Sequence, residues 1–348
     1  MKKTERPSKN PSRLLFARFV PVVAFWLAMT GCSTQTVDEA GPEGVPIGFG
    51  IRPATRASVM TDADITDMGV FGYYTGTTAW SVAASTAAPD IFDNQKISKS
   101  EGNWSYLPVR YWPAGTTSKT SFFAYSPHST SALANGSITP PSAGTAGEPL
   151  IGFTVPADVA DQVDLLRGTP QTDKNRTGGT VTFLLKHALT KISFVGRLAT
   201  GESGKGYSAK VTRVGITGIK NSGTLNLATG GWTFGDGTAD YSVSVADGTL
   251  VDETFNTETD KTLTPSTAYL LLPPQALGDE AFVNVTVEIT GSIETTLSLN
   301  LALSQATPEW EAGIGYVYRF EVAGEFITID TNLTPWTTGT SDSGGVSQ

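Results

Sequence analysis

The stretch FVNVTVEITGSIETTLSLNLAL, residues 282–303, decides the fold class. Apolar residues occupy every other position in two runs, separated by Gly291 and Ser292. The runs are Val283, Val285, Val287 and Ile289, then Leu297, Leu299, Leu301 and Leu303. A period of two places each run on one face of a strand, and the turn residues would close an antiparallel hairpin. One buried and one solvated face per strand predicts a β-sandwich.

Short runs of the same kind occur along most of the chain, between loops rich in Gly, Ser, Thr and Pro. They predict strands at residues 45–51, 68–74, 106–112, 120–125, 152–155, 180–185, 190–198, 211–217, 224–227, 268–272, 316–322 and 326–333. One helix is predicted over residues 157–167, from the spacing of Val159, Val163 and Leu166 ahead of Gly168. The chain has 348 residues, more than one sandwich core usually needs. We therefore predict an all-β protein with two tandem β-sandwich domains, at residues 57–186 and 187–348.

Residues 1–31 have the features of a signal peptide, with basic residues ahead of an apolar stretch from Phe19 to Met29. That stretch is too short for a permanent membrane span. It ends in Met29-Thr30-Gly31-Cys32, which resembles the lipobox of bacterial lipoproteins, and Cys32 is the only cysteine. We predict lipidation at Cys32, including a palmitate chain. The alternative is an ordinary signal peptide with an incidental cysteine. Residues 32–56 would form a tether and a first strand.

The mature chain is acidic. The leader holds six basic residues and one acidic residue, so its removal changes the formal charge from −9 by −5, to −14. An acidic surface repels phosphate groups, and no Lys/Arg-rich run follows residue 32. We therefore expect no nucleic-acid partner, and membrane contact only through the lipid.

Residues for catalysis are scarce. The sequence has two histidines, His128 and His187, and lacks the common hydrolase, nucleotide-binding and metal-binding motifs. We predict that the protein is not an enzyme and has no catalytic, cofactor or metal site. Asp62, Asp64 and Asp67 could bind Ca²⁺, but a solvated turn is the better interpretation. Aromatic residues could form a sugar-stacking platform, although half-buried core positions explain them better; they are Tyr73, Tyr74, Trp80, Trp104, Tyr106, Tyr111 and Trp112.

A series of short stretches carries a family resemblance along almost the whole chain. They are Thr55-Arg56-Ala57, Met68 to Tyr74, Tyr111-Trp112-Pro113, Phe122 to Pro127, His187 to Ile192, Leu270 to Pro273, Trp310 to Gly313, Tyr316-Val317-Tyr318 and Pro335-Trp336. In this order they resemble the fimbrillin family, the Mfa-like and type V pilus proteins of the Bacteroidetes. The resemblance implies two transthyretin-like sandwiches and a fimbrial (pilus) subunit that mediates adhesion.

The resemblance also implies an assembly mechanism. The subunit would reach the outer membrane as a lipoprotein, where a trypsin-like protease cuts between Arg56 and Ala57, with Arg52 as the second choice. The cut would release the first strand, whose apolar face is Val45, Ile47, Phe49 and Ile51. A strand from a neighbouring subunit would then fill the groove and build a surface fimbrium that could bind a host or bacterial ligand. Unpaired strand edges do demand such a replacement.

Two interpretations are open for the C-terminal part of the chain. The stretch Phe326 to Leu333, with Ile327, Ile329 and Leu333, is a candidate donor, because residues 337–348 are too polar and Gly-rich to serve. It could instead be the chain's own last strand, as in a tip or accessory subunit. The alternative function is a lipid-anchored surface glycan-binding protein, and a glycan hydrolase is the third hypothesis.

Overall fold

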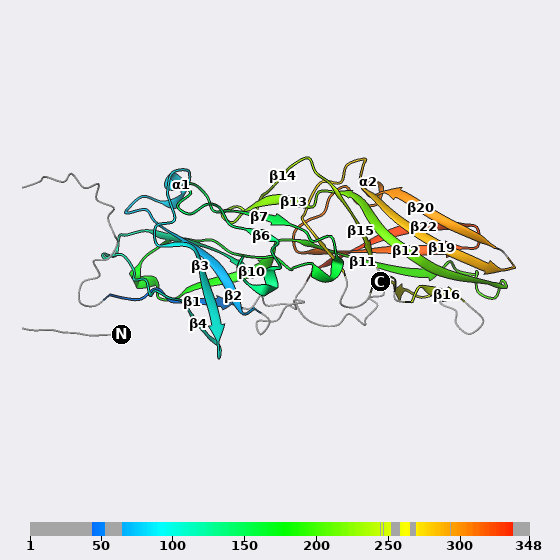
Figure 1. Ribbon diagram of the computed structural model, residues 1–348, viewed down its shortest axis with the longest axis horizontal. Coiled ribbons are helices and arrows are strands. Elements are labelled where there is room, and N and C mark those ends of the chain that lie inside the picture. Colours follow the sequence, from blue (N-terminus) through cyan, green and yellow to red (C-terminus); the bar gives the residue numbers. More distant parts are fainter. Residues whose placement is uncertain are drawn as a thin grey trace, which may run out of the picture. The chain divides into compact units, whose positions relative to one another are not determined.

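The computed structural model describes residues 44–52, 65–243, 245, 247–251, 258–264, 269–292 and 294–336. Contacts between Cα atoms divide the chain into Met1–Thr36 and Val37–Gln348, and all described residues belong to the second unit. The described part consists of packed β-sheets with short helical turns (Figure 1). The predicted all-β fold class is therefore confirmed. Within these residues no helix is both long and apolar enough to cross a membrane.

The first sheet has the strand order β1-β10-β8-β5-β2-β3-β4, with β9 paired to β5. Its strands are β1 (Phe49–Arg52), β2 (Asp67–Tyr74), β3 (Phe92–Ser100), β4 (Asn103–Ser105), β5 (Thr120–Ser126), β8 (Leu166–Gly168), β9 (Gln171–Lys174) and β10 (Val181–His187). The central strands β2 and β5 are buried on both faces. In β2, Met68 and Val70 join one apolar cluster, while Phe71 and Tyr73 join another. Position 69, between Met68 and Val70, requires glycine, because a Cβ there would collide with the ring of Tyr125.

A second sheet packs on one face of the first. Its order is β14-β13-β7-β6, and its strands are β6 (Ile138–Thr139), β7 (Leu150–Thr154), β13 (Ser222–Asn226) and β14 (Trp232–Phe234). Phe153 and Leu225 of this sheet share a buried cluster with Phe71 and Phe123 of the first. Strand β13, which follows residue 187, pairs with β7, which precedes it. The two halves of the chain thus share a sheet, and the division between residues 186 and 187 stays a prediction.

Two further sheets enclose the rest of the core. One has the order β17-β11-β21-β22, with β18 on β11, and contains β11 (Thr190–Leu198), β17 (Lys261–Thr262), β18 (Leu270–Leu272), β21 (Ile314–Ala323) and β22 (Phe326–Pro335). The other has the order β15-β12-β19-β20, with β16 on β12, and contains β12 (Tyr207–Ile219), β15 (Ala239–Val243), β16 (Thr249–Val251), β19 (Phe282–Gly291) and β20 (Thr295–Ala302). The predicted hairpin is confirmed as β19 and β20, in which Val285 lies opposite Leu299.

Two predicted elements are wrong. The helix predicted over residues 157–167 is a 3₁₀ turn, Val159–Asp161, followed by extended chain that enters β8. Leu166 is needed in the ladder, where it pairs with β5 and β10. Residues 106–112 form no strand, although Tyr111 makes an isolated bridge to Pro46. Pro108 deprives this segment of one backbone donor. Short helical elements that the sequence did not predict are α1 (Trp80–Ala83), α2 (Leu303–Ala306), Ala132–Ala134 and Arg176–Gly178.

Candidate functional site

The N-terminal described segment, residues 44–52, lies between two parts of the first half of the chain. Its beginning runs antiparallel to the loop at residues 106–112: the Ile47 amide donates to the Arg110 carbonyl and the Trp112 amide donates to the Val45 carbonyl, both at 2.9 Å. Its end, β1, runs parallel to β10, with Phe49 opposite Val181 and Arg52 opposite Leu184 (Figure 1). The segment is therefore tied to its neighbours on both sides by backbone hydrogen bonds.

Phe49 occupies an aromatic pocket. Its ring centroid lies 5.2 Å from that of Phe92, 5.6 Å from Tyr106, 5.8 Å from Phe122 and 6.2 Å from Phe183. Three of these contacts are edge-to-face, a favourable geometry for aromatic pairs. Removal of the strand would open this pocket to water.

Tyr106 covers the segment from the loop side. Its hydroxyl donates a hydrogen bond of 2.7 Å to the carbonyl of Ile47. Burial raises the pKa of the Tyr106 hydroxyl, so the group stays protonated and can keep donating. A side chain thus reinforces the backbone bonds that hold the first strand.

The four apolar residues of the first strand are buried to different depths. Ile47 is 1% exposed and Phe49 is 7% exposed, and both join the same cluster as Phe122 and Phe183. Ile51 is half-buried against this cluster, whereas Val45 is 36% exposed. Of the four predicted apolar positions, only Ile47 and Phe49 are fully buried, and they are the two anchors.

Several predicted site residues fall outside the described part of the chain. They are Cys32, Arg56, Ala57, Asp62 and Asp64. Arg52 is described: it is the exposed last residue of β1 and is paired with β10. Asp67, the remaining member of the acidic cluster, already accepts from the His128 amide and pairs with Lys96.

The candidate donor strand is β22, which forms the edge of its sheet. All ten of its residues pair with β21, from Phe326 opposite Ala323 to Pro335 opposite Ile314. None of its side chains is buried: Ile327 and Ile329 are half-buried, and Leu333 is 57% exposed. In the described part of the chain the strand thus pairs within its own sheet, and only Ile327 and Ile329 pack against the apolar core.

The aromatic residues of the first half do not assemble into one platform. Tyr73 and Trp80 pack together in one buried cluster, with their ring centroids 4.9 Å apart. Trp112 is buried in the other cluster, where Tyr106 packs at its edge. The conservative interpretation of these residues as core positions fits this arrangement better than a sugar-stacking surface.

The two histidines lie in separate buried environments. The ring of His128 contacts the Thr130 hydroxyl at 2.9 Å and the Asn94 carbonyl at 3.1 Å, and burial lowers its pKa. His187 ends β10 and contacts Asp164. In the described ranges, no group of three or more His, Cys, Asp or Glu side chains is arranged to hold a metal.

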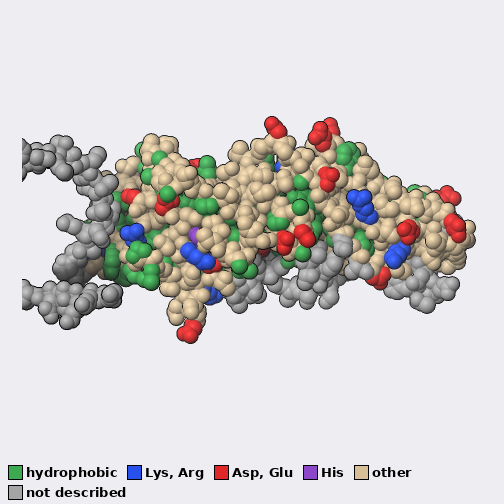
Figure 2. Space-filling view, viewed as in Figure 1, with side chains coloured by type: hydrophobic (Ala, Val, Ile, Leu, Met, Phe, Trp, Pro, Cys, Tyr) green, Lys and Arg blue, Asp and Glu red, His purple; other side chains and the backbone are tan. Residues whose placement is uncertain are grey.

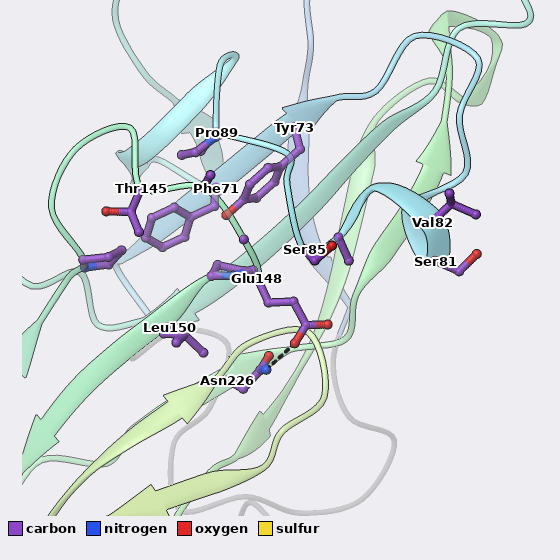
Figure 3. Close-up of a pocket in the computed structure, with 15 residues that line it drawn as sticks. Phe71, Tyr73, Ser81, Val82, Ser85, Pro89, Thr145, Glu148, Leu150 and Asn226 are labelled. Atoms are coloured by element: carbon purple, nitrogen blue, oxygen red, sulfur yellow. Dashed lines mark hydrogen bonds between the residues drawn. The ribbon is translucent and has the colours of Figure 1, made fainter.

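Sequence reasoning missed one cavity, of about 500 Å³. Phe71 and Tyr73 of β2 form one side, and α1 and the loop before β7 form the others (Figure 3). The Glu148 carboxylate accepts a hydrogen bond from Asn226 at 2.5 Å across its floor. Burial, with Asp93 and Glu148 nearby, raises the pKa of Tyr73. Glu148 stands in a polar loop with no periodicity, so no sequence signal could have found this cavity.

Charged side chains are spread over the visible surface. On the face drawn in Figure 2, Asp and Glu side chains occur along its whole length, and Lys and Arg side chains stand singly among them. This distribution agrees with the acidic composition, with a sequence pI near 4.8. It offers no basic stripe on this face to follow a phosphate backbone.

Comparisons with known sequences match the chain to fimbrial proteins. A sequence profile described as fimbrillin-like matches residues 55–336. A fimbrium subunit of Phocaeicola vulgatus, Fim1C, is 26% identical over 181 residues, which are 48% of this chain and 48% of that protein. The chain thus aligns with about half the length of this curated relative.

Solved structures show the same fold. A fimbrial protein from Bacteroides vulgatus superposes with a TM-score of 0.67 at 19% identity, covering 84% of this chain and 99% of that one. A candidate cell adhesion protein from Bacteroides uniformis superposes with a TM-score of 0.55 at 17% identity, with the same coverage. Because the profile spans most of the described residues, the chain belongs to the fimbrillin-like family.

Proposed function

We propose that the chain is a subunit of a cell-surface fimbrium and that its first strand is a removable plug. The observation that carries this proposal is the seating of residues 45–52 between the 106–112 loop and β10, with Phe49 in its aromatic pocket. Burial of Ile47 and Phe49 stabilises the strand by roughly 1.5–3 kcal/mol each. Its loss would leave unpaired backbone on both sides of an apolar trough, which another strand must fill.

A protease cut just after the strand would release it. Arg56 is the preferred position, because Arg52 is paired with Leu184 in the ladder and a protease needs extended, accessible chain. The protease would be trypsin-like, since the residue before the cut is Arg. Until that cut, lipid on Cys32 would hold the subunit at the outer membrane.

Strand β22 is the proposed donor to a neighbouring subunit. Ile327 and Ile329 show the two-residue spacing of Ile47, Phe49 and Ile51 in the plug, and Leu333 follows on the same face four residues later. Its side chains are exposed or half-buried, so transfer to another chain would uncover only the part of the donor's core that Ile327 and Ile329 cover. The resulting contacts are head-to-tail and generate an open filament.

The N-terminus of the chain in native surface fibres tests this function. Fibres sheared from cells and sequenced from the N-terminus should begin at Ala57. Fibre subunits that begin at lipidated Cys32 would contradict removal of the plug. The corresponding control is the cell-associated precursor, which should retain residues 32–56.

Glycan binding is the second candidate function, and the cavity in Figure 3 is the observation that favours it. Its volume suits a small ligand. Ser81, Ser85 and Glu148 offer polar groups that could bond sugar hydroxyls. Calorimetric titration of the intact monomer with polysaccharide fragments tests this role, and Glu148→Gln should weaken any binding there. Heat changes that are identical in the variant would exclude this cavity as the site.

A further inference from the structure

The last strand is fixed to the rest of the fold at its C-terminal end. Trp336, which directly follows β22, stacks on the imidazole of His187, with ring centroids 3.8 Å apart and planes 11° apart. The Trp336 amide also donates a hydrogen bond of 2.9 Å to the Gly313 carbonyl. His187, Gly313 and Trp336 come from three separate stretches of sequence that the fold brings to one point.

His187 is held in place by elements from the first half of the chain. It is the last residue of β10, and its Nδ1 lies 3.0 and 2.9 Å from the two carboxylate oxygens of Asp164. A carboxylate only accepts, so Nδ1 carries the proton and the ring plane is fixed. The imidazole thus presents one face to the indole.

Trp336 is more deeply buried than any residue of β22, the strand that it follows. The side chains of β22 are exposed or half-buried, whereas Trp336 is 7% exposed. The ion pair from the strand to its neighbour, Asp330 to Arg319, is long at 3.4 Å, and the Asp330 side chain is 75% exposed. Within residues 326–336, the indole is therefore the only buried side chain.

The contact is made of ring faces and not of directional bonds. His187 Nε2 and Trp336 Nε1 are both buried, and neither has a hydrogen-bond partner among the described residues. A buried N–H without a partner makes a contact less stable than a fully bonded one of the same size. Such a contact can hold a strand and still open.

We propose that the His187–Trp336 stack is the pin that decides whether β22 stays on its own sheet, with His187 as a positioning residue for the indole. This inference rests on the proposed function, in which β22 is donated to another subunit. When the indole leaves the imidazole, β22 retains its ladder with β21, its half-buried side chains and the exposed ion pair from Asp330 to Arg319. The strand then opens from its C-terminal end.

Hydrogen exchange of the intact chain tests the pin. In Trp336→Ala, amides of residues 326–334 should exchange about tenfold faster or more, while β12 and β19 keep wild-type rates. The control is Trp80→Ala, which removes an indole that is equally buried, at 7% exposure, but lies in α1. It should leave β22 unchanged.

Variants of His187 distinguish the loss of ring stacking from the loss of a buried side chain as the cause of faster exchange in β22. His187→Ala should accelerate exchange in β22, and His187→Phe, which retains a flat ring but not the bond to Asp164, should restore protection in part. His128→Ala removes a histidine that is also buried and should not affect β22. If Trp336→Ala does not fold, Trp336→Phe should give an intermediate acceleration.

Two results would overturn the pin: unchanged exchange in β22 of the Trp336 variant, or equal acceleration in all core strands. Assembly of protein lacking residues 1–56 is followed in parallel. Faster exchange in β22 without any assembly supports the pin and contradicts the proposed function. Assembly with unchanged exchange in β22 supports the function and overturns the pin.

Discussion

Phe49 is one of the two residues that anchor the first strand. Its ring contacts four other rings in the first half of the chain. The sequence predicted that this side chain is buried, because alternation of apolar residues is a local signal. It could not predict the pocket, whose rings come from β3, the 106–112 loop, β5 and β10.

Phe49→Ala should lower the free energy of unfolding of the intact chain by about 3 kcal/mol, because it leaves a cavity among rings that cannot collapse together. The control is Phe326→Ala, at a side chain that is 59% exposed. This variant should change the free energy of unfolding by less than about 0.5 kcal/mol. Urea denaturation measures both. Equal effects in the two variants would mean that the aromatic pocket does not anchor the strand.

Tyr106→Phe should lower the free energy of unfolding by about 1 kcal/mol, because the variant loses the hydrogen bond from the hydroxyl to the Ile47 carbonyl. It should also accelerate hydrogen exchange at the Ile47 amide. Tyr111→Phe, at a side chain that is 43% exposed, serves as the matched control. Residue-resolved exchange makes the comparison. Normal protection of Ile47 in Tyr106→Phe would argue against a role for this hydroxyl in holding the strand.

At the scale of elements, the sequence predicted strands well and other elements poorly. The hairpin of β19 and β20 and strand β11 follow from alternation alone. The helix predicted over residues 157–167 is wrong because its apolar residues do not share one face: Val159 is half-buried against one apolar cluster, whereas Leu166 is buried in the other. The cavity and the His187–Trp336 contact were beyond prediction, since both join segments that are distant in the sequence.

Strand β22 should lose its donor capacity when one apolar side chain becomes charged. In protein lacking residues 1–56, Ile329→Asp should block assembly, because a carboxylate would enter the trough that Phe49 leaves. Thr328→Asp places the same charge on the exposed face of the strand and should assemble normally. Light scattering measures both. Equal assembly of the two variants would exclude this face as the donating surface.

The first strand should also block assembly when it is supplied as a separate peptide. A synthetic peptide of residues 44–52 added to protein lacking residues 1–56 should keep it monomeric, because the peptide refills both the hydrogen-bond ladder and the aromatic pocket. The same peptide with Phe49→Asp should have no effect. Sedimentation velocity distinguishes the outcomes. Equal inhibition by both peptides would contradict recognition through the pocket.

At the scale of the whole molecule, the proposed assembly depends on two strands that are far apart in the sequence, β1 and β22. The first strand fills a groove formed by β10 and the 106–112 loop, and the last strand lies exposed on the edge formed by β21. Family membership supports assembly with other subunits. One chain would then both accept and donate a strand, which is the requirement for a filament.

The most direct test of this account is the mass of the protein before and after removal of residues 1–56. By light scattering, the intact chain should stay monomeric, and the shortened chain should form a ladder of oligomers that lengthens with time and concentration. A shortened chain that remains a folded monomer at every concentration would contradict the central claim.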